Sequence, residues 1–437
     1  MKEYDLIVIG AGPGGYNLAA GARTAGQSVL LIEKNHPGGT CLNRGCIPTK
    51  ALRAAAKRLQ ECRSDSEFGI SCTTGELDYS AVHGRMEKVV DELRQGVEMM
   101  LEGVDRINAE AAFTGPNTVK AADEEYTAGK IVIATGSKPA MLPVPGADLC
   151  IDSDGILAAD TLPESIIIIG GGVIGMEFAC ILNAFGVKVT VIEYCQEILP
   201  PFDAEVSKRL RTILKRKGIA VITGAAVTAI EADGDSRKVI YTAKGKEKSE
   251  TAQKVLMAVG RRPVVPQGAT EAGIALTSRG FIDTNESLKT SMEGIYAIGD
   301  VNGRSLLAHS AEAQAEALLS GEDFPTLIPG VAFTDPECAM VGVTEQNAPE
   351  GYKTGKAIFR SNGYAMAIGE TDGFVKVITD AKGKLVGAHI IGPGASELIA
   401  EAALAIDHGL SARDLSSTVH AHPTLSETLA AACRQCK

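Results

Sequence analysis

Cys41 and Cys46 are the residues with the clearest capacity for chemistry, because only four residues separate them in a short segment, residues 38–50. Pro48 and the helix-favouring composition that follows it predict a helix beginning just after Cys46. A helix N-terminus stabilises a thiolate, and two neighbouring thiols can exchange two electrons as a disulfide. The alternatives are two unconnected thiols in a loop, or half of a zinc site, which would need a second pair of ligands.

A histidine near the C-terminus offers the base that thiol exchange requires. His422 precedes Pro423, which favours the start of a helix, and Glu427 is close enough in sequence to orient the imidazole. A structural role is the alternative for such a histidine, and His420 is the rival candidate for the base.

An internal repeat supplies the elements that would hold a reaction partner beside these residues. Adding 160 to the numbers of residues 6–15 superposes them on residues 166–175, each an apolar run followed by GxGxxG. The same offset relates Glu33 to Glu193, each lying after a second apolar run. Strand, glycine turn, helix, strand and acid form the dinucleotide-binding βαβ unit, in which the acid bonds a ribose 2′-hydroxyl. The sequence therefore predicts two bound dinucleotides, each with a free 2′-hydroxyl.

A second repeat, with an offset of 124, relates residues 130–139 to residues 254–263. Each copy has the pattern of a buried strand that ends in glycine and then proline, and we expect each loop to return to its own dinucleotide. The remaining sequence predicts strands over 373–379 and 384–391 and helices over 396–408 and 425–433.

The expected fold is α/β, with two Rossmann-like domains and a C-terminal α+β domain. The predicted boundaries are 1–142 with 264–325 for the first dinucleotide domain, 143–263 for the second, and 326–437 for the third.

Composition excludes several classes of protein. The chain has 437 residues and a net charge of −11, from 43 basic and 54 acidic side chains, which disfavours nucleic-acid binding. The apolar run 166–176 is too short to span a bilayer. Acidic residues stand near Met1 where a signal peptide would carry basic ones, so we expect a cytoplasmic protein whose ten cysteines are mostly thiols.

The chain resembles the pyridine nucleotide–disulfide oxidoreductases in several segments: residues 38–50, both glycine loops, residues 293–301 and residues 420–427. Within that family the chain resembles specifically the enzymes that oxidise dihydrolipoyl groups. The resemblance implies FAD in the first unit and NAD in the second. It also implies a homodimer, with the lipoyl group on another chain, a 2-oxoacid dehydrogenase or a glycine-cleavage carrier.

The resemblance also implies roles for individual residues. Cys41 would meet the substrate, Cys46 would face the flavin, and His422 with Glu427 would reach the disulfide of the other subunit. Lys50 and Glu177 would pair near the flavin N5 and the nicotinamide. The residues implied for FAD are Gly10, Gly12, Gly14, Gly15, Glu33, Lys34, Gly39, Thr40, Lys50, Ala111, Thr135, Gly136, Ser137, Asp300 and Ala308. Those implied for NAD are Gly170, Gly172, Val173, Ile174, Gly175, Glu193, Val227 and Gly260. No metal is expected.

Three features depart from the family pattern. Residues 346–352 form a shortened stretch, Asp335 replaces a commoner histidine, and the chain ends in a CxxC pair, Cys433 and Cys436. We expect that pair to lie on an exposed, frayed terminus without a function. Two other functions remain open: a reductase of another disulfide or of a metal ion, and a flavin-bound redox sensor or scaffold.

Overall fold

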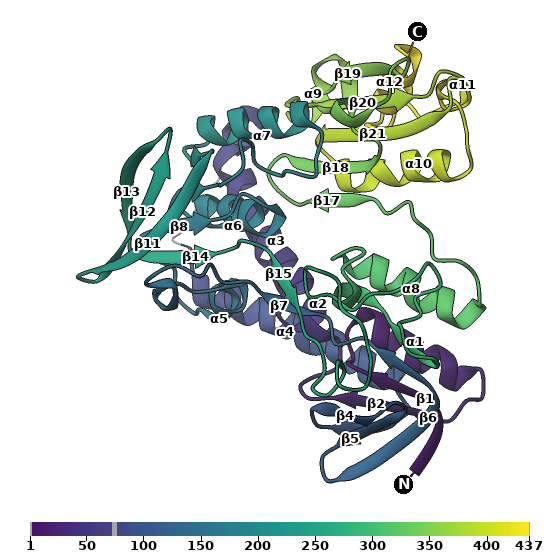
Figure 1. Ribbon diagram of the computed structural model, residues 1–437. Helices are drawn as coiled ribbons and strands as arrows, with labels where there is room; N and C mark the ends of the chain where they lie inside the picture. The colour runs from purple at the N-terminus through teal and green to yellow at the C-terminus, as the bar shows by residue number, and fades with distance from the viewer. Residues whose placement is uncertain (1, 72–76, 437) are drawn as a thin grey trace.

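The computed structural model describes residues 2–71 and 77–436 and shows three lobes, each built on a sheet of its own (Figure 1). The N-terminus lies in the first lobe and the C-terminus at the far end of the third. None of the helices in the described part of the chain combines the length and the apolar character needed to cross a membrane. The predicted fold class is confirmed.

The first lobe has a seven-stranded sheet in the order β3-β2-β1-β6-β5-β4, with β16 added to β6. Its strands are β1 (Lys2–Ile9), β2 (Val29–Glu33), β3 (Asp105–Asn108), β4 (Ala111–Gly115), β5 (Thr118–Ala121), β6 (Glu124–Ile133) and β16 (Ile295–Ala297). Its helices are α1 (Pro13–Thr24), α2 (Gly39–Arg44), α3 (Cys46–Ser64), α4 (Tyr79–Met100) and α8 (Ala308–Ser320). Alternate residues of β1 enter different cores, Leu6 and Val8 on one face and Ile7 and Ile9 on the other. Burial on both faces explains the unbroken apolar run of this parallel strand.

The second lobe repeats this plan with a parallel sheet in the order β10-β9-β8-β14, and a three-stranded antiparallel sheet, β11-β12-β13, lies beside it. The strands are β8 (Ser165–Ile169), β9 (Lys188–Ile192), β10 (Ala220–Ile222), β11 (Ala225–Asp233), β12 (Ser236–Ala243), β13 (Lys246–Ala252) and β14 (Lys254–Met257). The helices are α5 (Ser153–Ala158), α6 (Val173–Ala184) and α7 (Ala204–Arg216).

The third lobe is an antiparallel sheet in the order β17-β18-β21-β20-β19 with helices packed against it. The strands are β17 (Gly330–Ala332), β18 (Glu337–Gly342), β19 (Lys353–Ile358), β20 (Phe374–Thr379) and β21 (Leu385–Gly392). The helices are α9 (Gly363–Ala367), α10 (Ala395–Asp407), α11 (Ala412–Ser417) and α12 (Glu427–Arg434). The predicted elements lie within two residues of β20, β21, α10 and α12. The helix predicted over 425–433 is α12, which begins two residues later, at Glu427.

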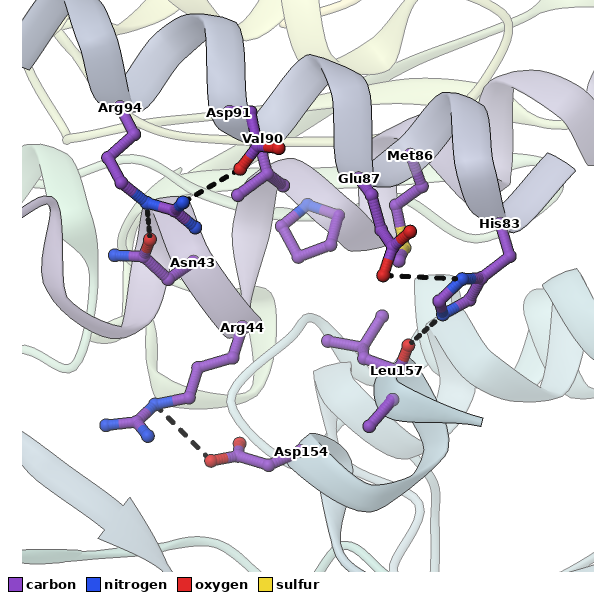
Figure 2. A pocket seen from close by; sticks show the side chains of 12 residues that line it. Asn43, Arg44, His83, Met86, Glu87, Val90, Asp91, Arg94, Asp154 and Leu157 are labelled. Atoms are coloured by element: carbon purple, nitrogen blue, oxygen red, sulfur yellow. Dashed lines mark hydrogen bonds and ion pairs between the residues drawn. The ribbon is translucent and has the colours of Figure 1, made fainter. Parts of the chain in front are cut away.

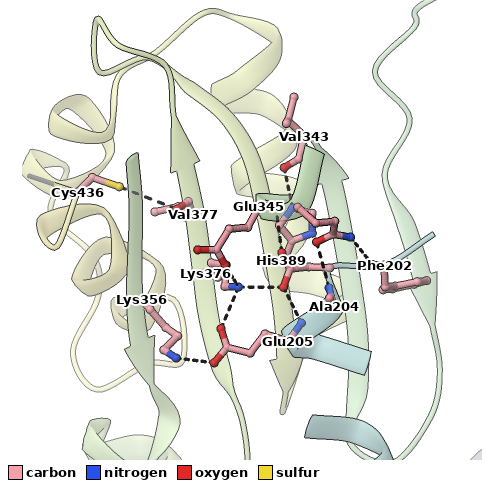
Figure 3. A network of polar contacts seen from close by, with 12 residues as sticks. Phe202, Ala204, Glu205, Val343, Glu345, Lys356, Lys376, Val377, His389 and Cys436 are labelled. Carbon is pink, nitrogen blue, oxygen red and sulfur yellow. Dashed lines mark hydrogen bonds and ion pairs between the residues drawn. The ribbon is translucent and has the colours of Figure 1, made fainter. Parts of the chain in front are cut away.

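The contacts between the lobes include a short strand pair and a buried lysine. The segments after the second repeat, β7 (Ser137–Pro139) and β15 (Arg261–Pro263), pair with each other as an antiparallel ribbon. Helix α7 is attached to the third sheet by Lys376, whose buried ammonium lies 2.9 Å from carboxylate oxygens of both Asp203 and Glu205 (Figure 3). Because Lys376 belongs to β20 and both acids lie at the start of α7, this contact fixes the second lobe against the third.

Candidate functional site

The first glycine loop has the backbone that a dinucleotide pyrophosphate requires. Gly10 has φ +101°, and a Cβ there would lie 2.5 Å from the Ala134 carbonyl oxygen. A Cβ at Gly15 would lie 1.9 Å from the Gly10 oxygen, so helix and strand pack without room for a side chain. At Gly12, in contrast, a Cβ would meet nothing within 4 Å. The space beside Gly12 at the N-terminus of α1 fits a ligand phosphate.

The acid at the end of β2 braces this loop. One oxygen of Glu33 accepts a hydrogen bond from the Ala11 amide at 2.7 Å, and the other accepts from Asn35 at 2.8 Å. Each carboxylate oxygen retains a lone pair for a ribose hydroxyl.

The second glycine loop reproduces these contacts residue for residue. Glu193 accepts hydrogen bonds from the amides of Gly171 and Cys195, which are the counterparts of Ala11 and Asn35 at the offset of 160. A Cβ at Gly175 would lie 2.0 Å from the Gly170 oxygen, whereas Gly172 again faces open space. The internal repeat therefore extends from sequence to hydrogen bonding, and this loop also fits a dinucleotide.

Helix α2, which carries Cys41, is clamped onto the first loop. The Gly38 amide donates to the Ala11 carbonyl at 2.8 Å, and a Cβ at Gly39 would lie 2.6 Å from Gly12 Cα. This close backbone contact places the thiol segment directly beside the first dinucleotide loop.

The two thiols have opposite electrostatic environments. The Cys41 S–H donates a hydrogen bond to the Cys46 sulfur, and this bond raises the pKa of Cys41 and lowers the pKa of Cys46. The nearby Lys50 ammonium lowers the pKa of Cys46 further. Cys46 is also the first residue of α3, where the helix dipole favours an anion. The pair therefore favours a Cys46 thiolate beside a Cys41 thiol.

Lys50 and Glu177 form the predicted pair, with 2.8 Å between the ammonium and the carboxylate. The other oxygen of Glu177 accepts a hydrogen bond from the Phe333 amide at 2.9 Å, and the Lys50 ammonium lies 4.3 Å from the centre of the Phe333 ring. The side chain of Glu177 is 6% exposed, so its charge depends on these partners.

Asp300 lies in a short 3-10 turn, residues 299–302, that follows β16. Burial raises the pKa of its carboxyl group, while a hydrogen bond from the Ser137 hydroxyl and the charge of Arg261 act in the opposite direction. The Arg261 Nε lies 3.7 Å from an Asp300 oxygen.

The two candidate histidines differ in which nitrogens are available. The His422 Nδ1 donates to Glu427 at 3.0 Å, its Nε2 faces no hydrogen-bond partner among the described residues, and 79% of the side chain is exposed. Both ring nitrogens of His420 are engaged, with Glu401 at 2.8 Å and with the Thr418 carbonyl at 2.9 Å. Only His422 offers a free nitrogen for a proton.

The Glu427 carboxylate stays ionised to lower pH than an ordinary glutamate. A hydrogen bond from the Thr424 amide, followed by the bond from His422, lowers its pKa. Among the described residues, no hydrogen bond or ion pair joins His422 or Glu427 to either thiol, and Figure 1 shows α12 in a different lobe from α2. Within one chain the structure does not bring the base to the disulfide.

The remaining predicted residues lie on loops, in strands and in helices of the first two lobes. Lys34 pairs with Glu110 at the surface. Thr135 and Gly136 form the turn between β6 and β7, and Gly260 forms its counterpart between β14 and β15. The other positions are Gly14 in α1, Thr40 in α2, Ser137 in β7, Ala111 at the start of β4, Ala308 at the start of α8, Val173 and Ile174 at the start of α6, and Val227 in β11.

The C-terminal cysteines are not on a frayed terminus, and that expectation is wrong. Cys433 is only 3% exposed and belongs to the core of the third lobe. A Cβ at Gly355 of β19 would lie 2.9 Å from the Cys436 sulfur, so the glycine makes room for this thiol. The apolar face of α12 packs against β19 and β20 and holds the tail on the sheet. This tertiary contact could not be predicted from the sequence near the C-terminus.

A cavity of about 430 Å³ adjoins the outer face of α2 but contains none of the predicted site residues (Figure 2). Arg94 lines it and donates to the Asn43 side chain at 2.9 Å, and Asn43 in turn donates to the Gly39 carbonyl at 2.9 Å. The hydrogen bonds of these lining residues hold α2 in position. The lining includes neither a residue of the glycine loops nor either cysteine.

Sequence analysis missed Phe333 and Arg261. No local pattern marks Phe333, because it acts through its amide on an acid 156 positions away. The offset of 124 could have identified Arg261, since it is the counterpart of Ser137, which was predicted.

Comparison with known proteins agrees with this geometry. Residues 4–315 match the model of the pyridine nucleotide-disulphide oxidoreductases, and residues 328–433 match the dimerisation domain of the same family. The chain is 41% identical to a dihydrolipoyl dehydrogenase of Geobacillus stearothermophilus, over 97% of this chain and 94% of the relative. It is 40% identical to the enzyme of that name from Thermus scotoductus, over 98% and 96%. The copper(II) complex of the HOCl-induced flavoprotein disulfide reductase RclA from Escherichia coli is similar in structure, with a TM-score of 0.89, 28% identity and 99% of each chain covered.

Proposed function

The chain belongs to the pyridine nucleotide-disulphide oxidoreductase family, and we propose that it oxidises dihydrolipoyl groups on a carrier protein through a Cys41–Cys46 disulfide. The enzyme uses FAD and NAD, as members of this family do. The observation that supports the proposal best is the unequal thiol pair, clamped beside the first glycine loop and next to the Lys50–Glu177 pair.

We assign the first lobe, residues 1–142 and 264–325, to FAD, residues 143–263 to NAD, and residues 326–437 to the subunit interface. The open spaces beside Gly12 and Gly172 support one pyrophosphate at each loop. Glu33 and Glu193 would each accept a hydrogen bond from a ribose 2′-hydroxyl.

In the proposed reaction, a substrate thiolate attacks Cys41 of the disulfide, a mixed disulfide forms, and Cys46 leaves as a thiolate. The α3 N-terminus and Lys50 stabilise that thiolate. The second substrate thiol then attacks the mixed disulfide, which closes the lipoyl ring and returns Cys41 to a thiol. FAD, when bound at the first loop, would supply the two-electron chemistry that links this thiol pair to NAD, and the Cys41–Cys46 disulfide would re-form as the pair is oxidised.

His422 would deprotonate the incoming thiol through its free Nε2, while Glu427 holds the Nδ1 proton. Because this histidine lies in a different lobe from its own chain's disulfide, we propose that it serves the disulfide of the partner in a homodimer. The dimerisation domain supports this arrangement.

The proposed partner is a lipoyl protein of a 2-oxoacid dehydrogenase or glycine-cleavage system. We place the reaction in the cytoplasm, where thiols are kept reducible.

An anaerobic titration of the holoenzyme with dihydrolipoamide, followed by NAD, tests the function. About one equivalent of dithiol should give the two-electron-reduced enzyme with its long-wavelength absorption band, and NAD should reverse this change with formation of NADH. Rapid reduction by NADH with turnover only on another disulfide, or on a metal ion, would favour the reductase alternative. Slow half-reactions in both directions would favour a redox sensor.

A further inference from the structure

Arg261 belongs to the NAD lobe by sequence, but its side chain lies in the FAD lobe. It follows Gly260, whose φ of +112° and open Cβ direction are those of a ligand-facing turn. The guanidinium extends away from that turn, and its Nε and Nη2 donate to the Ser137 hydroxyl and carbonyl at 2.6 and 2.8 Å.

Arg261 also places a positive charge beside Asp300, the carboxylate that we assign to the flavin site. The Ser137 hydroxyl, itself held by Arg261, donates to Asp300. Arg261 forms the one ion pair recorded for Asp300 among the described residues, and the arginine side chain is only 12% exposed. Burial raises the pKa of Asp300, and the Ser137 hydrogen bond and then the Arg261 charge oppose that effect, so Ser137 and Arg261 together hold the carboxyl group in place.

The internal repeat gives this contact a wider meaning. Ser137 and Arg261 are equivalent positions at the offset of 124, and they lie in β7 and β15, which pair with each other. The turns just before these strands, at Gly136 and Gly260, both have positive φ and both face open space. One side chain therefore joins the equivalent turns of the two cofactor units.

We infer that Arg261 is a positioning residue for both cofactors: it orients Asp300 as a hydrogen-bond acceptor for FAD and anchors the Gly260 turn that lines NAD. This inference rests on the proposed assignment of the two lobes to FAD and NAD.

FAD titration of the apoprotein, followed by quenching of flavin fluorescence, tests the inference. Arg261→Gln should raise the FAD dissociation constant about tenfold or more, because a charge-assisted contact is lost and Asp300 is left unpaired. Arg261→Lys should fall between, since lysine keeps the charge but not the forked contact with Ser137. The neighbouring exposed Arg262 gives the matched control, and Arg262→Gln should stay within about twofold. Equal effects of the two glutamine variants would overturn the inference.

A double-mutant cycle tests whether Arg261 acts through Asp300. In an Asp300→Asn background, Arg261→Gln should cost much less FAD affinity than it does alone, and additive losses would overturn the inference. The cycle can use Arg261→Lys if the glutamine variant does not fold. In the holoenzyme, Arg261→Gln should raise the KM for NAD more than it lowers kcat. If Arg261→Gln and Arg262→Gln had the same KM for NAD, Arg261 would have no role at the Gly260 turn. The FAD titration needs no substrate, so a wild-type protein inactive on dihydrolipoamide would refute the proposed function and leave this result standing.

Discussion

Single residues set which dinucleotide and which thiol do the chemistry. Glu193 is buried and accepts hydrogen bonds from two backbone amides, so its carboxylate is fixed in place at the end of β9. The next side chains, Tyr194, Cys195 and Gln196, supply no positive charge. Cofactor choice in the second lobe therefore depends on one rigid anion.

We expect NAD to be preferred over NADP by about 100-fold or more in kcat/KM, because a 2′-phosphate facing Glu193 would cost several kcal/mol. Glu193→Gln should reduce this ratio at least tenfold while weakening NAD itself, since an amide N–H2 would then oppose a backbone N–H. Steady-state kinetics with both cofactors give the ratio. Equal efficiency with NADP in the wild type would refute the assignment of Glu193.

The lowered pKa of Cys46 predicts a pH-dependent spectrum. The two-electron-reduced enzyme should show a long-wavelength thiolate-to-flavin band that Cys46→Ser abolishes, whereas Cys41→Ser should keep a band without reduction. The thiolate is the form present above the pKa, so the band should persist below the ordinary cysteine value of about 8.5 and fade as the pH drops through the lowered pKa. Spectra recorded across pH provide the measurement. The opposite behaviour of the two serine variants would reverse the assignment of the thiols.

His422→Ala should slow flavin reduction by dihydrolipoamide by about 10²–10⁴ and leave reduction by NADH nearly unchanged. The reason is the free Nε2, which His420 lacks. Stopped-flow measurements separate the two half-reactions. His420→Ala is the control, and a larger loss from that variant would mean that His420 is the base.

Among the elements, α7 shows how one lobe is fixed to another. Its N-cap residue Asp203 accepts hydrogen bonds from the Glu205 and Glu345 amides and from Lys376, in the network that Figure 3 shows. Lys376 is 3% exposed and Asp203 1% exposed, so neither charge can turn to water. The joint between α7 and the third sheet is therefore strong only while the ion pair is complete.

Lys376→Met should loosen this joint, because breaking a buried ion pair costs about 3–5 kcal/mol. Hydrogen exchange of the β20 amides should speed up by about 100-fold or more. Lys356 also pairs with Glu205, but its side chain is 42% exposed, and Lys356→Met should change exchange by only about fivefold. The explanation fails if the two variants exchange alike.

At the scale of the whole molecule, the chain keeps the proposed base, His422, in a different lobe from the two thiols (Figure 1), so the proposed site needs a second chain. Neither thiol bonds to the turn of residues 420–427 within the described chain, although that turn is ordered by Glu427 and Glu401. The dimerisation domain covers residues 328–433, which include this turn.

Mixing two inactive variants tests this arrangement. Cys46→Ser and His422→Ala subunits, unfolded and refolded together, should form mixed dimers in which one of the two sites is intact. Random pairing then restores about a quarter of wild-type turnover. Each variant refolded alone is the control, and a mixture no more active than its components would show that each chain uses its own histidine.

The sequence by itself determined the glycine loops, the acids that brace them and the thiol segment. These features are local: a positive φ at Gly10 or an amide bonded to Glu33 depends on residues within one βαβ unit, and the repeat shows it twice. The fold class followed from the same patterns. The contacts that depend on chain topology were decided only by the tertiary structure.

Three hydrogen bonds join residues more than 100 positions apart: Phe333 with Glu177, Arg261 with Ser137, and Lys376 with Asp203. The neighbouring Pro423 and Glu427 favour His422 over His420 in the sequence. Only the structure shows that Glu401 of α10 and the Thr418 carbonyl occupy both ring nitrogens of His420. The partner of a buried charge is determined by how whole elements pack together, so it cannot be predicted from the spacing of nearby residues.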